Sequence, residues 1–158
     1  MNQDEQERIL GIRHPLPISK LRGVPPTVRL RLKSQRITTC AQLLLAARDA
    51  ASRAALLKTT GIDEAVMLQL VQRADMARIR GIGTVFGLML EELGVADVAQ
   101  LAEREPAELH AALRAYNLDE RLARRSPTME EVVEWIETAR TLPVVVTYES
   151  AAEPPAGE

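Results

Sequence analysis

The sequence has few aromatic residues. Phe, Trp and Tyr together make up 3% of the 158 residues, so the core has to be built from Leu, Ile, Val, Ala and Met. That aliphatic composition favours helices over sheets. Base stacking on aromatic side chains is the usual means of holding single-stranded nucleic acid, and it is not expected here.

Cysteine and histidine are also scarce. The single cysteine, Cys40, excludes an internal disulfide and a cysteine-rich metal site, and its apolar surroundings predict a buried thiol. His14 and His110 have no Cys, Asp or Glu at the spacing of metal ligands. Nucleophile-elbow, phosphate-loop and dinucleotide-binding motifs are missing. We therefore expect neither an enzyme nor a bound cofactor or metal.

Long apolar runs are missing as well. No stretch approaches the ~20 apolar residues of a membrane-spanning helix, and the polar start does not resemble a secretory signal. We expect a cytoplasmic protein with no membrane partner. Residues 1–16 are expected to form a flexible leader, because the end of this segment, His14-Pro-Leu-Pro, discourages helix. Residues 149–158 are expected to form a disordered acidic tail, because they are poor in apolar residues.

The net charge of -2 hides a strong asymmetry. Residues 1–80 hold 14 Lys and Arg against 7 Asp and Glu, a balance of +7, and residues 81–158 hold 6 against 15, a balance of -9. Such a division indicates that the two ends meet different partners, or each other.

One segment occurs twice, 58 residues apart. Leu21-Arg-Gly-Val-Pro-Pro-Thr corresponds to Ile79-Arg-Gly-Ile-Gly-Thr-Val, and Ala41-Gln-Leu corresponds to Ala99-Gln-Leu. A repeat at a fixed offset is typical of one supersecondary unit used twice. We predict a helix after each glycine turn, over 27–35 and over 84–93, from the helical spacing of their apolar residues.

Further helix boundaries follow from capping signals. Thr39-Cys-Ala-Gln and Asp97-Val-Ala-Gln both fit a capping box. Gly61 and Asn117 share a position that suits a positive φ. A helix is predicted over 63–78 and another over 127–140, with Ser126 as its N-cap and Pro127 as its first residue. Residues 142–148 are expected to lie along the helices as an extended strap.

A helix, Gly81-Ile-Gly83 and a second helix resemble the helix-hairpin-helix motif. The two glycines allow a close turn, Ile82 would plug it, and the amides after Gly83 would form an anion site at a helix N-terminus. In proteins with this motif the anion is a nucleic-acid phosphate. The resemblance thus implies DNA binding that does not depend on sequence, although some hairpins of this class only pack against protein.

The whole arrangement resembles the bacterial proteins of the domain of unknown function 4332 family. The resemblance rests on the doubled hairpin, the helix with Trp135-Ile-Glu-Thr-Ala139 and the closing Pro143-Val-Val-Val-Thr-Tyr148, and it covers about residues 17–148. It implies an all-α fold in which two tandem helix-hairpin-helix repeats pack as one compact helical domain. We place the first repeat and its helical arm at 17–78, and the second, with its arm and the strap, at 79–148.

The two copies depart from the binding pattern in opposite ways. Pro25 and Pro26 remove two amide donors from the first copy, which is nevertheless strongly basic and has no acid from 20 to 36. The second copy keeps its glycines, but Glu91 and Glu92 follow them. Arg22 and Arg80 precede the two turns, where each would flank a phosphate or bind a carboxylate within the fold.

These features lead to two hypotheses. In the first, the protein is a non-catalytic module that grips duplex DNA with amides of copy two and side chains of copy one. The candidate residues of such a site are Arg22, Gly23, Arg29, Lys33, Arg36, Arg78, Arg80, Gly81, Ile82, Gly83 and Thr84. In the second, both hairpins are structural, and the protein is an interaction adaptor or a scaffold that associates with itself through its oppositely charged halves.

Overall fold

The computed structural model describes residues 5, 8, 10, 11 and 16–148. The predicted tail and most of the predicted leader therefore lie outside the described residues. Leu10 of the leader is described, and it is buried in the first core. Within the described residues the fold is all-helical. A short 3₁₀ helix is followed by eight α-helices: η1 (Ile18–Lys20), α2 (Pro26–Ser34), α3 (Cys40–Ala46), α4 (Ala50–Thr60), α5 (Glu64–Met76), α6 (Gly83–Glu92), α7 (Val98–Ala102), α8 (Pro106–Glu120) and α9 (Met129–Thr141).

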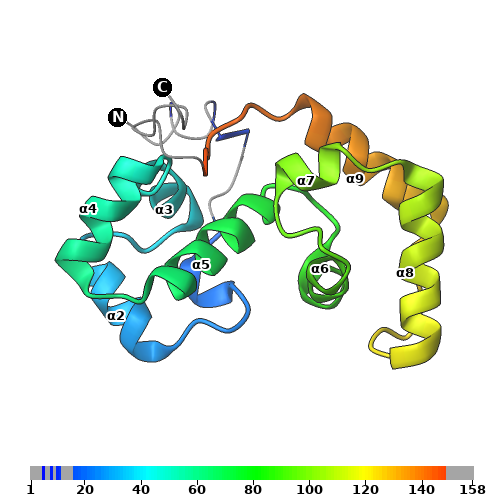
Figure 1. Cartoon of the computed structure of the whole chain (residues 1–158), viewed down its shortest axis with the longest axis horizontal. Helices are drawn as coiled ribbons and strands as arrows, with labels where there is room; N and C mark the ends of the chain where they lie inside the picture. The colour runs from blue at the N-terminus through cyan, green and yellow to red at the C-terminus, as the bar shows by residue number, and fades with distance from the viewer. Residues whose placement is uncertain (1–4, 6–7, 9, 12–15, 149–158) are drawn as a thin grey trace, which may run out of the picture.

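Two aliphatic cores lie side by side along the long axis. The first is enclosed by α2–α5 and contains Leu32, Leu43 and Leu70, and the second is enclosed by α6–α9 and surrounds Trp135. Helix α5 runs from the first half toward the second and joins them (Figure 1). The helical composition and the resemblance together predicted an all-α class with compact packing, and both are confirmed.

The sequence repeat reappears as a repeat of elements. Helices α2, α3 and α4 in the first half correspond to α6, α7 and α8 in the second, with starts close to 58 residues apart. The ends of α2 and α6 also match, because Ile37 N–H donates to the Leu32 carbonyl at 3.0 Å and Val95 N–H donates to the Leu90 carbonyl at 2.8 Å. This hydrogen bond closes a helix of the same kind in both halves.

Most of the capping predictions are confirmed. Thr39 and Gln42 form a complete capping box, and Asp97 accepts from the Gln100 amide at 2.8 Å. Gly61 ends α4 with a φ of +68°.

Two boundary predictions are wrong. Helix α9 starts after Thr128, whose side chain forms a capping box with Glu131, so Ser126 is not the N-cap. Asn117 lies inside α8, and the positive φ falls instead on Arg121, at +53°. Asn117 uses its side chain to bind the Ala123 backbone through both its amide nitrogen and its amide oxygen.

The strap expected over 142–148 is present and ties the two halves together. Leu142 packs against the second core, whereas Val146 belongs to the first. Thr147 N–H donates to the Arg48 carbonyl at 2.8 Å, and the Arg53 guanidinium lies 5.4 Å from the centre of the Tyr148 ring. The strap crosses the top of Figure 1 from α9 back to the first half. No strand forms in the described part of the chain, where Pro17 and Thr39 make an isolated bridge.

Candidate nucleic-acid interface

The turn between α5 and α6 brings three predicted site residues to the start of α6. Gly81 and Gly83 have φ values of +87° and +69°, in the left-handed region that favours glycine. Ile82 is buried between them, as expected of a residue that plugs the turn. A side chain added at Gly83 would meet no atom within 4 Å, so the first turn of α6 opens toward solvent.

Helix α6 begins without a side-chain cap. Helices α3, α4, α5, α7, α8 and α9 each start with a Thr, Asp or Glu side chain that accepts from the first turn. Helix α2 is also uncapped, but Pro25 and Pro26 leave it two fewer N–H groups. Among the described α-helices, α6 therefore combines a full set of amides with no side chain to accept from them.

The first glycine turn lies against the start of α6. The Arg22 guanidinium donates to the Thr84 carbonyl at 3.2 Å and forms an ion pair with Glu91 of the same helix. Arg73 of α5 reaches the same carboxylate, with its Nε 3.3 Å from Glu91 Oε2. Partial burial and the neighbouring Arg73 guanidinium lower the pKa of Arg22. Of the two roles left open for Arg22, the structure shows the internal carboxylate contact.

Gly23 is required by this packing. Arg73 donates to the Arg22 carbonyl at 2.7 Å, and a Cβ at position 23 would lie 2.8 Å from the same Arg73 nitrogen. The φ of +71° at Gly23 would strain any other residue as well. In the first copy, the glycine thus admits an arginine of α5, whereas at the equivalent Gly81 of the second copy an added Cβ would lie 3.6 Å from Trp135 Nε1.

A cleft of about 420 Å³ lies between the two turns. One wall is formed by Lys20, Leu21 and Arg22, and the facing wall includes Ile82, Gly83 and Thr84. The structure therefore brings side chains of copy one to the amide turn of copy two, as a composite clamp requires. The cations concerned are Lys20, Arg22 and Arg73, and both arginines are already paired with Glu91.

The predicted basic face of α2 lies apart from that cleft. Arg29, Lys33 and Arg36 are exposed, they form no ion pair or side-chain hydrogen bond within the described residues, and none of them lines the cleft. Arg36 follows the end of α2 with a φ of +62°. The face is free to meet a partner, on α2 rather than between the turns.

Arg78 and Arg80 have opposite surroundings. Arg78 is buried: it forms an ion pair with Asp75 at 2.8 Å and donates to the Leu10 and Pro143 carbonyls at 2.8 and 2.6 Å. It therefore cannot reach a nucleic acid at the surface, and its place among the candidate residues is corrected. Arg80 is exposed, with no ion pair or side-chain hydrogen bond in the described part of the chain.

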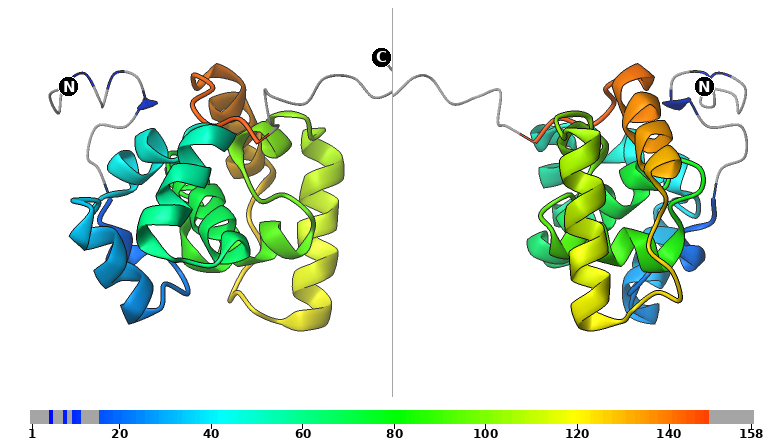
Figure 2. Two further views of the ribbon diagram at one scale, coloured as in Figure 1. Left: turned by 60° about the vertical axis from the view of Figure 1, so that its left-hand side comes forward. Right: turned by 90° about the vertical axis from the view of Figure 1, so that its right-hand side faces the viewer.

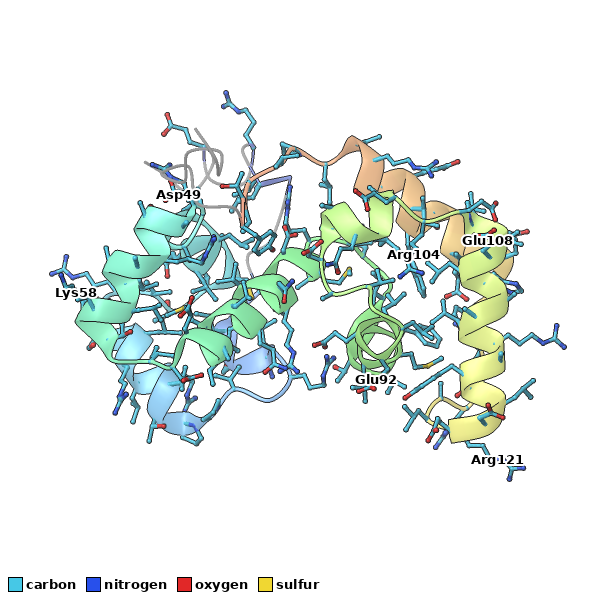
Figure 3. All side chains as sticks on the ribbon, in the orientation of Figure 1. Asp49, Lys58, Glu92, Arg104, Glu108 and Arg121 are labelled. Carbon is cyan, nitrogen blue, oxygen red and sulfur yellow. The ribbon has the colours of Figure 1, made fainter. Side chains whose placement is uncertain are left out.

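Sequence reasoning missed three of the four charged residues that line the cleft. Lys20, Arg73 and Glu91 were not among the candidates, although all three line it. The pattern offered a weak signal for Glu91, because an acid on the helix after a phosphate-binding turn is unfavourable unless a cation neutralises it. Glu92, the next residue, projects from α6 in Figure 3.

A family model described as a domain of unknown function, DUF4332, matches residues 22–142, more than half of the chain. The chain belongs to the DUF4332 family. This confirms the resemblance to that family, and the matched region of this DUF4332 protein runs from Arg22 to Leu142, the first residue of the strap. No curated relative and no solved structure matches the chain.

The described residues lack two features that would point to other functions. None of their helices is long and apolar enough to cross a membrane. Nor does the part of this DUF4332 chain that the structure describes contain a group of three or more His, Cys, Asp or Glu side chains able to hold a metal ion.

Proposed function

We propose that this DUF4332 protein is a non-catalytic module that binds the backbone of duplex DNA without reading its sequence. The observation that carries the proposal is the uncapped start of α6, where Gly83 and Thr84 leave their amides at an open turn beside Lys20. Helix N-termini of this kind favour phosphate, because their N–H groups point outward and the helix dipole is positive there. The α5–α6 turn would be the helix-hairpin-helix of the site.

The exposed cations supply the second part of the proposed interface. Lys20 lies at the cleft, Arg80 directly precedes the turn, and Arg29, Lys33 and Arg36 extend the positive surface along α2. Backbone binding is driven by the release of counterions from phosphates, so it needs cations rather than contacts to base edges. The shortage of aromatic residues fits this mode and disfavours stacking on single strands.

The proposed backbone contact can be tested without changing any charge. Pro26 of the first copy corresponds to Thr84 of the second, and proline is well tolerated in the first turn of a helix. Thr84→Pro removes one amide donor and leaves the Thr84 carbonyl contact to Arg22 possible. We expect DNA affinity to fall about tenfold, in line with the loss of one hydrogen bond to a charged group.

Thr84→Ala is the matched control, because it keeps the amide and removes only the side chain. Affinity for a duplex of random sequence would be measured by fluorescence anisotropy, and thermal unfolding would show that both variants are folded. Equal affinities for the proline and alanine variants would refute a phosphate contact at this turn.

The Arg22–Glu91–Arg73 network favours a second candidate function. Two cations that would suit a phosphate clamp instead join the first turn to α6. If both turns serve only to hold the halves together, the protein is an adaptor or scaffold for proteins. Unchanged DNA affinity after the joint substitution of Arg29, Lys33 and Arg36 by Glu would favour this candidate.

A further inference from the structure

The exposed side of α9 is acidic and has no partner within the described residues. Glu130, Glu134 and Glu137 are all exposed and form no ion pair there. The other charged side chains of the helix are engaged: Glu131 binds Arg125, with the Arg125 Nη1 and Glu131 Oε1 atoms 2.6 Å apart, and Arg140 donates to the Ala102 and Arg104 carbonyls. The three free carboxylates therefore form a stripe that nothing in the fold neutralises.

The basic face of α2 carries the opposite charge with the same spacing. Arg29, Lys33 and Arg36 are separated by four and three residues, as are Glu130, Glu134 and Glu137. Side chains at these intervals share one side of a helix. Glu130, Glu134 and Glu137 all lie within α9. Arg29 and Lys33 lie on α2, and Arg36 follows the end of that helix. The two stripes thus carry opposite charges.

These two stripes cannot pair within one molecule. Helix α2 lies at the lower edge of the molecule and α9 at its upper edge, both in Figure 1 and in the turned views of Figure 2. A second copy can bring them together. We infer that this protein associates with itself head to tail, with the basic face of α2 on one copy docked on the acidic face of α9 on the next.

Apolar side chains accompany both stripes. Leu30 on α2 is 59% exposed, and Met129 at the start of α9 is 40% exposed. Their burial would add apolar area to contacts that are otherwise electrostatic. Because the two faces differ, the contact is heterologous, and it leaves one α2 and one α9 face free after each addition. Association therefore continues beyond a dimer unless a ring closes.

This inference does not rest on the proposed function, and its test contains no DNA. Sedimentation velocity of the full chain would be measured at about 0.01 M and about 1 M salt, where charges are screened beyond about 30 Å and about 3 Å respectively. We expect assemblies larger than a dimer at the lower concentration and monomers at the higher one. A monomer at low salt throughout the micromolar range would overturn the inference.

Charge reversal identifies the two faces. The variant Arg29→Glu/Lys33→Glu loses the basic docking face of α2 and keeps the acidic face of α9. The variant Glu130→Lys/Glu134→Lys loses the acidic face of α9 and keeps the basic face of α2. Each should be monomeric alone, because like charges then face each other. Mixed in equal amounts, they should form a dimer and nothing larger, since the one remaining pair of complementary faces is used once.

Two control variants carry the same changes in net charge elsewhere on the surface. Lys58→Glu/Arg114→Glu and Asp119→Lys/Glu120→Lys alter exposed residues outside both stripes, and they should still assemble at low salt. If these controls dissociate as readily as the stripe variants, net charge rather than docking of α2 on α9 governs association. Failure of the mixture to form a dimer, while the unaltered protein assembles, would also contradict the inference.

Discussion

Three arginines with similar positions in the sequence pattern have different roles in the structure. Arg22 pairs with Glu91 and holds the first turn against α6, whereas Arg78 is buried and joins α5 to the strap and to Leu10. Arg80, two residues later, points into solvent. A basic residue next to a glycine turn is therefore not by itself a sign of phosphate contact.

Arg78 provides the clearest test of an internal role. Arg78→Met would leave the Asp75 carboxylate buried and unpaired and would release the Leu10 and Pro143 carbonyls. Breaking a buried pair in this way costs about 3–5 kcal/mol of unfolding free energy. Urea denaturation would measure the loss.

Arg80→Met is the matched control for that substitution. Its side chain is exposed, so a change of within about 0.5 kcal/mol is expected. Comparable stability of the two variants would show that the Asp75–Arg78 pair does not hold the strap in place.

The ion pair at the start of α9 predicts a dependence of stability on pH. Hydrogen bonds from the Arg125 side chain and the Thr128 backbone lower the pKa of Glu131 from 4.5 to about 2. Because the unfolded chain binds the proton at higher pH, the stabilisation is present above about pH 4.5 and is lost as the pH falls toward 2. The carboxylate is partly solvated, so we expect less than about 1 kcal/mol.

Glu131→Gln keeps the capping hydrogen bond and removes the charge. The difference in unfolding free energy between the unaltered protein and this variant should shrink as the pH is lowered from about 5 to about 2. A difference that stays constant over this range would mean that the Arg125 contact contributes nothing to stability.

At the scale of the element, the sequence predicted the repeated helices well, because periodicity and capping are local signals. Helices α2, α3, α6 and α7 begin within about one residue of their predicted positions, and both halves keep the same helix endings. The error at α9 arose where two start signals compete. Ser126-Pro127 and Thr128 with Glu131 both mark a helix start, and the capping box prevails because it satisfies amides at both of its ends.

The start of α9 gives a test at this scale. Thr128→Ala should lower the unfolding free energy by about 1 kcal/mol, since the side chain accepts from the Glu131 amide. Ser126→Ala should change it by less than about 0.5 kcal/mol. Thermal or urea unfolding of both variants would show which residue caps α9. A larger loss of unfolding free energy for Ser126→Ala would contradict the assignment of Thr128 as the cap.

The candidate site was less predictable than the helices, because its contacts join segments far apart in the sequence. Glu91 lies 69 residues after Arg22, and no local pattern states that these two side chains meet. The same holds for Arg78, whose partners Leu10 and Pro143 come from two distant segments. Periodicity fixes which face of a helix is polar, but it does not identify the group that the face meets.

At the scale of the molecule, the duplicated helices form the two packed halves, and the uneven distribution of charge gives these halves a basic and an acidic face. The strap and helix α5 join two cores, so the glycine turns are held in fixed positions relative to each other across one cleft. The basic face of α2 remains open on one edge and the acidic face of α9 on the other (Figures 1 and 2). Binding of DNA and head-to-tail association would both use α2, so DNA is expected to compete with assembly.

If the protein binds the backbone of duplex DNA, its affinity must depend strongly on salt. The exposed cations of the interface would neutralise about five phosphates, so the logarithm of the association constant should fall with the logarithm of salt concentration with a slope of about -4 to -5. These cations are Lys20, Arg29, Lys33, Arg36 and Arg80. The slope should be the same for duplexes of unrelated sequence. No binding at about 0.01 M salt, or an affinity that does not change with salt, would contradict the account.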